Sequence, residues 1–423
     1  MISKLRRSPY IQFLPFLLYY IYYIIKFRYP ELFGDEPRYI TFAANLLHGF
    51  FSPPAPDINL WSGPGYPIAL IPFTALHLSF LYLSLLNALF YYLSIVFLYK
   101  ALSYVVKERL AMLFAILWAF YHNLYQFLPA IYTEIFTAFL VSAVIYSLVL
   151  LYTKQKTRHL LLSGFLIGFL ALTKIIVGYV IVIGLIICLM LMLIKRNRGY
   201  YLKSVYILLL ALLTTAPYLL YTYNLTGKAF YWGNSGGMSL YWMSSPYELE
   251  YGDWKVPYLS NSIQPMPFNS AEGDSLLQAN HGKEMAFIMS HKGVEQDDLF
   301  KQTAIKYIKA SPKKFVRNYF YNLSRLFFDF PYSYTYQITQ TISNILIGSL
   351  LLWTSVICFI ASMINWHRLI YPVKFAMLLF VVYILLSGLA SAYARQLDVM
   401  VPILLFWIAY VISKFPKITL RFN

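Results

Sequence analysis

The chain consists mainly of apolar runs about as long as the hydrocarbon core of a membrane, separated by short polar segments. A helix crosses that core with about 20 apolar residues. The run 160–194 is too long for one such helix, so it predicts a tight hairpin of two. Ten membrane helices are therefore predicted, in the hairpin and at 8–27, 79–99, 110–128, 135–152, 201–222, 341–363, 371–390 and 397–413. Only 12% of the residues are charged, against about 25% in soluble domains, so we expect an all-α polytopic membrane protein.

Lysine and arginine gather in every second polar segment, and the segments between them are poor in both, except the long one at 223–340, which is exempt from the charge rule. These basic segments are 1–7, 100–109, 154–158, 195–203, 366–374 and 414–421. Because positive charge stays on the cytoplasmic side, both termini are predicted to be cytoplasmic, with an uncleaved first span. The outer side then receives a first loop at 28–66 and a polar "outer segment" at 223–340. The predicted organisation is an N-terminal membrane module (1–222), the outer segment, and C-terminal membrane helices (341–423).

The composition argues against several classes of function. A net charge of +17 would suggest nucleic acid in a soluble protein, but these cations lie in short loops, so no nucleic-acid partner is expected. Cys188 and Cys358 lie inside apolar runs, which argues against a disulfide framework or a thiolate metal site. The basic and aromatic stretch 301–328 predicts an amphipathic helix on the lipid headgroups, so membrane lipids are expected partners.

Ionisable residues gather at the outer ends of the predicted spans. They are Asp35, Glu36, Arg38, Glu134, Lys174 and Arg395. Charged groups at membrane depth are costly and are therefore candidates for function. A carboxylate can deprotonate a hydroxyl nucleophile, and cations can stabilise a phosphate leaving group. Glycosyl transfer from a lipid-phosphate sugar needs both, and its lipid donor would explain a site at the membrane face.

The segment 33–39 (Phe-Gly-Asp-Glu-Pro-Arg-Tyr) resembles the first-loop motif of the GT-C fold glycosyltransferases. Among these, the chain is similar to the protein O-mannosyltransferases and to the aminoarabinose transferase of lipid A. Further stretches resemble the family in the same order along most of the chain. They are the acidic motif 132–137, the Gly-rich run 164–174, the passage 217–237, the returning helix 304–312 and Arg395 before Val401-Pro402.

The resemblance implies a GT-C fold and a role for each ionisable residue. Asp35 would be the catalytic base, Glu36 would stand beside it in the catalytic site, and Arg38 would contact the donor phosphate. The other substrate- and phosphate-binding positions would be Glu134, Lys174 and Arg395. The implied reaction moves a single sugar, with inversion, from a polyprenyl-phosphate donor to an acceptor hydroxyl of a lipid, glycan or protein on the outer face. The protein would require no cofactor and would serve the cell envelope from a bacterial plasma membrane.

Two groups of residues raise the question of a metal. A divalent ion between Asp35 and Glu134 remains an alternative, because some relatives in this fold use one. The acidic and histidine residues of 281–298 are expected on a solvated surface instead of around a metal. They are His281, Glu284, His291, Glu295, Asp297 and Asp298.

The chain departs from the family at the end of the first outer loop. Many relatives carry Lys-Pro-Pro there, with a lysine that helps to bind the donor phosphate, whereas residues 61–67 read Trp-Ser-Gly-Pro-Gly-Tyr-Pro. Lys174 or Arg395 is expected to supply the missing charge. Three alternatives stay open: an oligosaccharyltransferase or ligase with a lipid-pyrophosphate donor, a transporter or flippase of lipid-linked sugar, and a non-catalytic scaffold. The acidic pair lies in a loop and not at mid-span, which disfavours transport.

Overall fold

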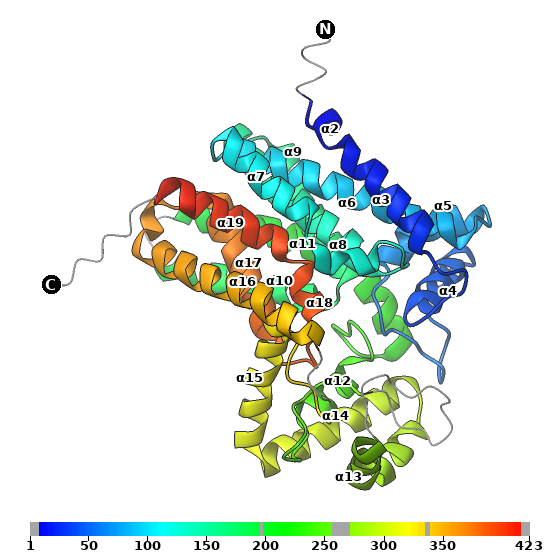
Figure 1. Cartoon of the computed structure of the whole chain (residues 1–423). Helices are drawn as coiled ribbons and strands as arrows, with labels where there is room; N and C mark the ends of the chain where they lie inside the picture. The colour runs from blue at the N-terminus through cyan, green and yellow to red at the C-terminus, as the bar shows by residue number, and fades with distance from the viewer. Residues whose placement is uncertain (1–7, 195–197, 256–270, 335–338, 416–423) are drawn as a thin grey trace, which may run out of the picture.

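The computed structural model describes residues 8–194, 198–255, 271–334 and 339–415. Within these ranges every regular element is a helix, which confirms the all-α prediction. The apolar helices form a bundle, and the helices of the outer segment lie together at one side of it (Figure 1). Of the basic segments predicted at 1–7, 195–203 and 414–421, residues 1–7, 195–197 and 416–421 lie outside the described residues.

The helices before the outer segment form the N-terminal part of the bundle and include α4, which lies within the first outer loop. They are α2 (Pro9–Gln12), α3 (Leu14–Phe27), α4 (Glu36–Leu47), α5 (Gly65–Ala75), α6 (Phe80–Ser103), α7 (Glu108–Ala119), η1 (His122–Phe127), α8 (Thr133–Lys154), α9 (Thr157–Thr173), α10 (Ile176–Ile194) and α11 (Arg198–Thr226). The outer segment and the C-terminal region supply the rest. They are α12 (Gly236–Met243), α13 (Ala271–Met289), α14 (Gly293–Ala310), α15 (Pro312–Phe328), α16 (Thr339–Ile364), η2 (Trp366–Arg368), α17 (Tyr371–Ser387), α18 (Ala394–Asp398) and α19 (Val401–Lys414).

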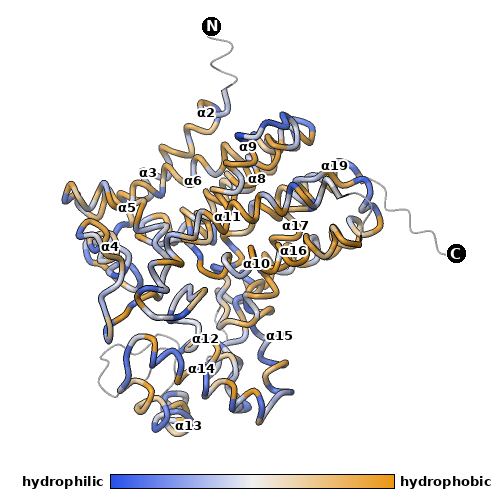
Figure 2. The backbone as a smooth tube through the Cα atoms, turned by 180° about the vertical axis from the view of Figure 1, so that it is seen from behind, coloured by the Kyte–Doolittle hydropathy of each residue, from blue (hydrophilic) through white to orange (hydrophobic). Residues whose placement is uncertain are grey.

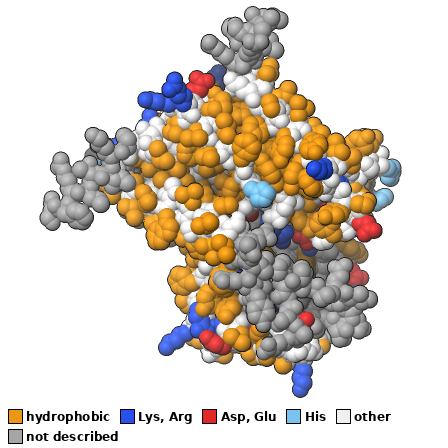
Figure 3. Space-filling model, viewed as in Figure 1, with side chains coloured by type: hydrophobic (Ala, Val, Ile, Leu, Met, Phe, Trp, Pro, Cys, Tyr) orange, Lys and Arg blue, Asp and Glu red, His pale blue; other side chains and the backbone are white. Residues whose placement is uncertain are grey.

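Helices lie at all ten predicted spans, and the chain is an integral membrane protein. Among the described helices, five are long and apolar enough to cross a membrane by length and composition: α6, α8, α10, α11 and α16. The other predicted spans are shorter helices. Apolar side chains cover most of the visible face of the bundle, and charged side chains lie mainly at its margins (Figure 3). The backbone view shows the same contrast between the apolar bundle and the mixed outer segment (Figure 2).

Two of the predicted spans can be compared with the observed helix ends. The hairpin predicted at 160–194 is confirmed, because α9 ends and α10 begins on either side of Lys174. The span predicted at 110–128 is shorter, since α7 ends at Ala119. Beyond it the Tyr121 hydroxyl donates to the Asp398 carboxylate at 2.6 Å and the Asn123 amide donates to the same oxygen at 3.3 Å. These bonds hold the chain in the short η1 helix instead of a continued α-helix.

The Gly-rich run of α9 permits close packing against α11. A Cβ added at Gly164 would lie 2.5 Å from Leu210 Cβ, and one added at Gly168 would lie 2.5 Å from Thr214 Cβ. Small residues allow membrane helices to approach in this way. α8 packs in turn on α6, α9, α17 and α19. The outer ends of α8 and α9 are thereby held side by side.

The outer segment has an apolar core of its own. Its buried residues are Met238, Tyr241, Trp242, Leu277, Met285, Ile288 and Phe300. α12 and α13 both pack on α14, and α15 returns to contact α16, α17 and α18. The outer segment thus packs around a core of its own, and α15 connects it to the C-terminal helices.

The amphipathic stretch predicted at 301–328 differs from expectation in two ways. It is broken into α14 and α15 at Pro312, which has no N–H to continue the helical hydrogen bonds. In α15 the polar side chains of Asn322 and Arg325 are buried, whereas Val316 and Phe320 are exposed. Asn322 and Arg325 therefore point into the protein, whereas Arg317 of the same helix is exposed.

Candidate active site

Asp35 lies in the first outer loop, directly before α4. Gly34 has a φ of +60°, and a Cβ there would lie 2.0 Å from the Tyr132 hydroxyl oxygen, so the position requires glycine. The backbone N–H of Asp35 donates to that same hydroxyl at 3.3 Å. The turn before α8 therefore fixes the backbone that presents the Asp35 carboxylate.

Glu36 faces away from its neighbour and anchors the loop. Its carboxylate is fully buried and forms an ion pair with Arg28, which is also buried. One carboxylate oxygen accepts the backbone N–H of Ile131 at 2.6 Å, and the other accepts that of Phe33 at 3.1 Å. Arg28 also donates to the Pro129 carbonyl at 2.9 Å. The pair thus fastens the start of α4 to the segment that precedes α8.

The other five predicted site residues come together in one ionic cluster. Asp35 forms an ion pair with Arg38 through one oxygen and lies 3.6 Å from Arg395 Nη1 through the other. The same Arg395 nitrogen lies 3.7 Å from Glu134 Oε1, and that oxygen accepts the Lys174 ammonium at 3.0 Å. Two carboxylates and three cations from four separate parts of the chain are therefore linked.

The two carboxylates of the cluster differ in access to solvent. The Glu134 side chain is 2% exposed, whereas that of Asp35 is 30% exposed. Burial opposes the charge of Arg395, but Glu134 and Asp35 together raise the pKa of its guanidinium above the ordinary range. Arg395 therefore stays charged, and Asp35 is the carboxylate that a substrate can reach.

The guanidinium of Arg395 also bears on the alternative of a bridging divalent ion. One of its nitrogens lies between the Asp35 and Glu134 carboxylates, where it supplies the positive charge that such an ion would bring. In the described part of the chain, no group of three or more His, Cys, Asp or Glu side chains is arranged to hold a metal. We derive no step through a metal.

The end of the first loop lies against the outer end of α9. The Asn234 side chain accepts the N–H of Leu60 at 2.9 Å and donates to the Ile58 carbonyl at 2.9 Å, so the outer segment holds the loop. A Cβ at Gly63 would lie 2.0 Å from the Leu172 carbonyl oxygen. The loop that lacks the family's lysine thus packs beside the helix end that carries Lys174.

Replacing Gly63 with alanine is expected to disturb this contact strongly. The added Cβ would overlap a backbone carbonyl, which cannot rotate away as a side chain can. Overpacking of this kind costs about 1–3 kcal/mol. We expect a lower midpoint of thermal unfolding in detergent. Gly236→Ala is the matched control, because a Cβ there meets nothing within 4 Å; equal midpoints for the two variants would contradict the packing argument.

Sequence reasoning did not identify Arg28 as part of the site. Arg28 follows the first span on the predicted outer side, whose short loops are otherwise poor in lysine and arginine, and this exception to the charge rule was the available signal. Trp61 and Trp254 were also missed as site residues. The Trp61 ring lies 5.5 Å from the Arg38 guanidinium and meets the Trp254 ring at 5.8 Å. Nothing in the spacing of Trp254 marks it.

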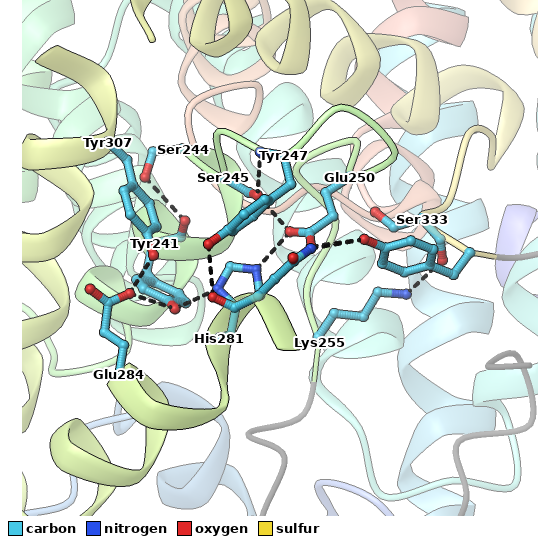
Figure 4. A network of polar contacts seen from close by, with 12 residues as sticks. Tyr241, Ser244, Ser245, Tyr247, Glu250, Lys255, His281, Glu284, Tyr307 and Ser333 are labelled. Carbon is cyan, nitrogen blue, oxygen red and sulfur yellow. Dashed lines mark hydrogen bonds and ion pairs between the residues drawn. The ribbon is translucent and has the colours of Figure 1, made fainter. Parts of the chain in front are cut away.

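The prediction of a solvated surface at 281–298 is wrong for His281 and Asp297, which are buried. His281 lies between two partners in the outer segment (Figure 4). Its Nε2 is 2.8 Å from a Glu250 carboxylate oxygen, and its Nδ1 is 2.6 Å from the Tyr241 hydroxyl. Glu284 accepts from the same hydroxyl at 3.0 Å. The apolar core encloses these groups, and they serve each other as hydrogen-bond partners.

Acid is expected to destabilise the outer segment. Burial acts to raise the pKa of Glu250 and of Asp253, yet hydrogen bonds and charges from His281 and Lys255 leave both below their ordinary values of 4.5 and 3.8. Unfolded carboxyls bind protons at those ordinary values, so the stabilisation is present above them and is lost as the pH falls further. Tryptophan fluorescence during thermal unfolding measures this. Glu250→Gln should be less stable at neutral pH and should lose less on acidification; a rise in wild-type stability below pH 4.5 would refute the sign.

Part of the chain matches a known family in sequence. Residues 64–221 match the profile described as dolichyl-phosphate-mannose-protein mannosyltransferase. This range contains the stretches 132–137 and 164–174, and the match confirms the resemblance predicted from them; the first-loop motif lies before it. No curated protein has a significant sequence match to the chain.

Two solved structures are similar to the chain over most of its length. The oligosaccharyltransferase AglB of the archaeon Archaeoglobus fulgidus, in complex with an inhibitory peptide and a dolichol-phosphate, is 15% identical, with a TM-score of 0.49 over 95% of this chain. This chain spans 50% of the length of AglB. ArnT of Cupriavidus metallidurans, bound to undecaprenyl phosphate, is 13% identical, with a TM-score of 0.41 over 96% of this chain and 77% of ArnT.

Proposed function

We propose that this protein is a membrane glycosyltransferase that moves a single sugar from a polyprenyl-phosphate donor to an acceptor hydroxyl on the outer face of the membrane. The observation that carries the proposal is the position of Asp35, a partly exposed carboxylate held between two arginines. The match of residues 64–221 to a mannosyltransferase family supports the reaction class. The bacterial plasma membrane, with both termini in the cytoplasm, is the proposed location.

In the proposed reaction Asp35 acts as the general base. Its carboxylate takes the proton of the acceptor hydroxyl while the acceptor oxygen forms a bond to the anomeric carbon. The bond between that carbon and the phosphate oxygen breaks, and polyprenyl phosphate leaves with the electron pair. A single displacement of this kind inverts the anomeric centre. A positioned general base contributes about 10²–10⁴ in rate.

The cations of the cluster suit the leaving group. A phosphodiester donor carries one negative charge, and the departing phosphate monoester gains a second during the reaction. Arg38, Lys174 and Arg395 outnumber the two carboxylates of the cluster, so the site has net positive charge before the donor arrives. Preorganised charge that meets developing charge is often the largest contribution to catalysis. Lys174 and Arg395 supply the positive charge that the missing first-loop lysine would bring to the donor phosphate.

The two buried acids have supporting roles in this mechanism. Glu134 holds Lys174 and Arg395 at its carboxylate, so that both cations face the site. Glu36, with Arg28, fixes the start of α4 and thereby the direction in which Asp35 points. Both are positioning residues, and Asp35 alone performs the proton transfer.

The test is incubation of the purified protein with radiolabelled polyprenyl-phosphate sugars and an envelope extract as the source of acceptor. We expect one labelled donor to be consumed, with label entering the extract and polyprenyl phosphate released, and we expect full activity in the presence of a chelator. Loss of activity in chelator would favour the lipid-pyrophosphate alternative. Movement of labelled lipid across a vesicle membrane without bond cleavage would identify a transporter. If no donor were consumed or moved, the non-catalytic scaffold would be the remaining alternative.

A further inference from the structure

Trp254 of the outer segment contacts the ring of Trp61, which in turn lies beside Arg38 of the ionic cluster. Trp254 lies between Asp253 and Lys255, which are both buried and form an ion pair at 3.0 Å. Asp253 accepts the backbone N–H of Ser333 at 3.1 Å, and Lys255 donates to the Ser333 carbonyl at 3.0 Å. The backbone on both sides of Trp254 is therefore anchored inside the outer segment.

Lys255 and Ser333 lie beside a network of hydrogen bonds around Glu250. Part of this network is drawn in Figure 4. Ser333 also accepts the N–H of Tyr251 at 2.9 Å through its hydroxyl oxygen. The Arg325 guanidinium of α15 donates to the Tyr251 carbonyl at 2.9 Å. Such a fixed backbone is needed for a side chain that must hold its place in a binding site.

Trp254 connects the aromatic neighbours of both arginines beside Asp35. Its ring meets that of Trp61 edge to face, with centroids 5.8 Å apart, and the Trp61 ring lies 5.5 Å from the Arg38 guanidinium. Its carbonyl accepts the Tyr393 hydroxyl at 3.5 Å, and the Tyr393 ring lies 5.5 Å from the Arg395 guanidinium. Trp254 thus contacts an aromatic neighbour of each of the two arginines that flank Asp35.

The orientation of the bound donor determines which of its groups lies against these two indole rings. A polyprenyl tail stays in the membrane, the phosphate meets the cations at the membrane face, and the sugar is the next group outward. The outer segment, which carries Trp254, lies on one side of the helix bundle (Figure 1). Through Trp254 it contacts Trp61, the neighbour of Arg38. Trp61 and Trp254 are both only half-buried, so part of each indole ring remains open to a ligand.

We propose that Trp61 and Trp254 bind the sugar ring of the donor and determine which sugars are accepted; this rests on the proposed function. A sugar ring has an apolar C–H face and a polar rim of hydroxyls. Ligand sites typically combine aromatic walls of this kind with a few charged or polar groups that fix orientation. The expected ligand is a neutral hexose or pentose whose C–H face packs on the indole rings. Trp254 is the specificity-determining member, because its backbone is anchored on both sides inside the outer segment.

Trp254→Ala separates recognition of the sugar from recognition of the phosphate. We expect the KM for the sugar-bearing donor to rise about tenfold, in line with about 1.4 kcal/mol for a lost aromatic contact. Inhibition by sugar-free polyprenyl phosphate should be unchanged, since the cations still bind its phosphate. Trp254→Phe should recover most of the loss. Trp353→Ala is the control, because Trp353 is 63% exposed on α16, and its KM should equal that of the wild type.

Three outcomes would overturn the inference. An unchanged donor KM in Trp254→Ala, with active wild-type protein, would overturn it and leave the proposed function intact. Equal weakening of donor binding and of polyprenyl-phosphate inhibition would also overturn it, because Trp254 would then act only by supporting the arginines. A wild-type protein that consumes no polyprenyl-phosphate sugar would refute the proposed function itself, and this inference with it.

Discussion

Replacing Asp35 with asparagine is expected to reduce sugar transfer by about 10²–10⁴, the usual contribution of a positioned general base. Asparagine has nearly the same shape, so the loop should keep its place, but its amide cannot accept the proton of the acceptor hydroxyl. The three cations remain, so sugar-free polyprenyl phosphate should still bind. Single-turnover transfer of radiolabelled sugar measures the effect without interference from product release.

The matched control for this variant is Glu31→Gln in the same loop. Glu31 is exposed, and loss of its charge should leave transfer at the wild-type rate. Both variants must insert and unfold like the wild type for the comparison to hold. Wild-type transfer by a properly inserted Asp35→Asn protein would mean that Asp35 is not the base.

Replacing Arg325 with methionine is expected to cause the largest loss of stability. The Arg325 side chain is fully buried and donates to the carbonyls of Pro331 at 2.8 Å and Tyr251 at 2.9 Å. It also lies 3.4 Å from the Ala392 carbonyl and bonds to the Asn322 amide oxygen. One guanidinium therefore joins α15 to the chain on both sides of it and to the loop that leads to Arg395.

Methionine fills a similar volume but leaves these carbonyls without a donor. Each unsatisfied buried group costs about 1–3 kcal/mol, and relief from burying a charge offsets part of the sum, so we expect a net loss of roughly 3–5 kcal/mol. Thermal unfolding in detergent measures this loss of stability. Sugar transfer should fall as well, because Trp254 and Arg395 lie close in sequence to the segments that Arg325 no longer holds. Arg317→Met is the control on the same helix, since its pair with Glu248 is exposed to solvent and contributes little to stability. Equal midpoints for both variants would show that the buried contacts contribute nothing.

The convergence of Asp35, Glu134, Lys174 and Arg395 could be anticipated from the sequence. Long apolar runs fix the number of spans, and the distribution of lysine and arginine fixes their direction, so residues at the ends of different spans are assigned to the same depth. The break at Lys174 followed from the length of one apolar run. These features depend on hydrophobicity and charge, which a sequence displays directly.

The division of labour between Asp35 and Glu36 could not be anticipated. The two acids are adjacent, and only the fold determines that Glu36 meets Arg28 and the Ile131 N–H while its neighbour faces the cations. The buried polar side chains of α15 were hidden for a related reason. Arg325 and Asn322 bond mainly to backbone carbonyls, and a carbonyl is present at every residue, so no pattern of side chains marks the partner.

The anchors of the first loop are made at different times during synthesis. Glu36 leaves the ribosome early, but the N–H that it accepts belongs to Ile131, 95 residues later. Arg395 is translated only after the whole outer segment. A nascent chain therefore carries Asp35 in the membrane without the partners that orient it, and its set of cations is complete only when the last helices arrive. Under the proposed function, a chain still being synthesised lacks the Arg395 guanidinium and therefore cannot yet set all three cations against a phosphate leaving group.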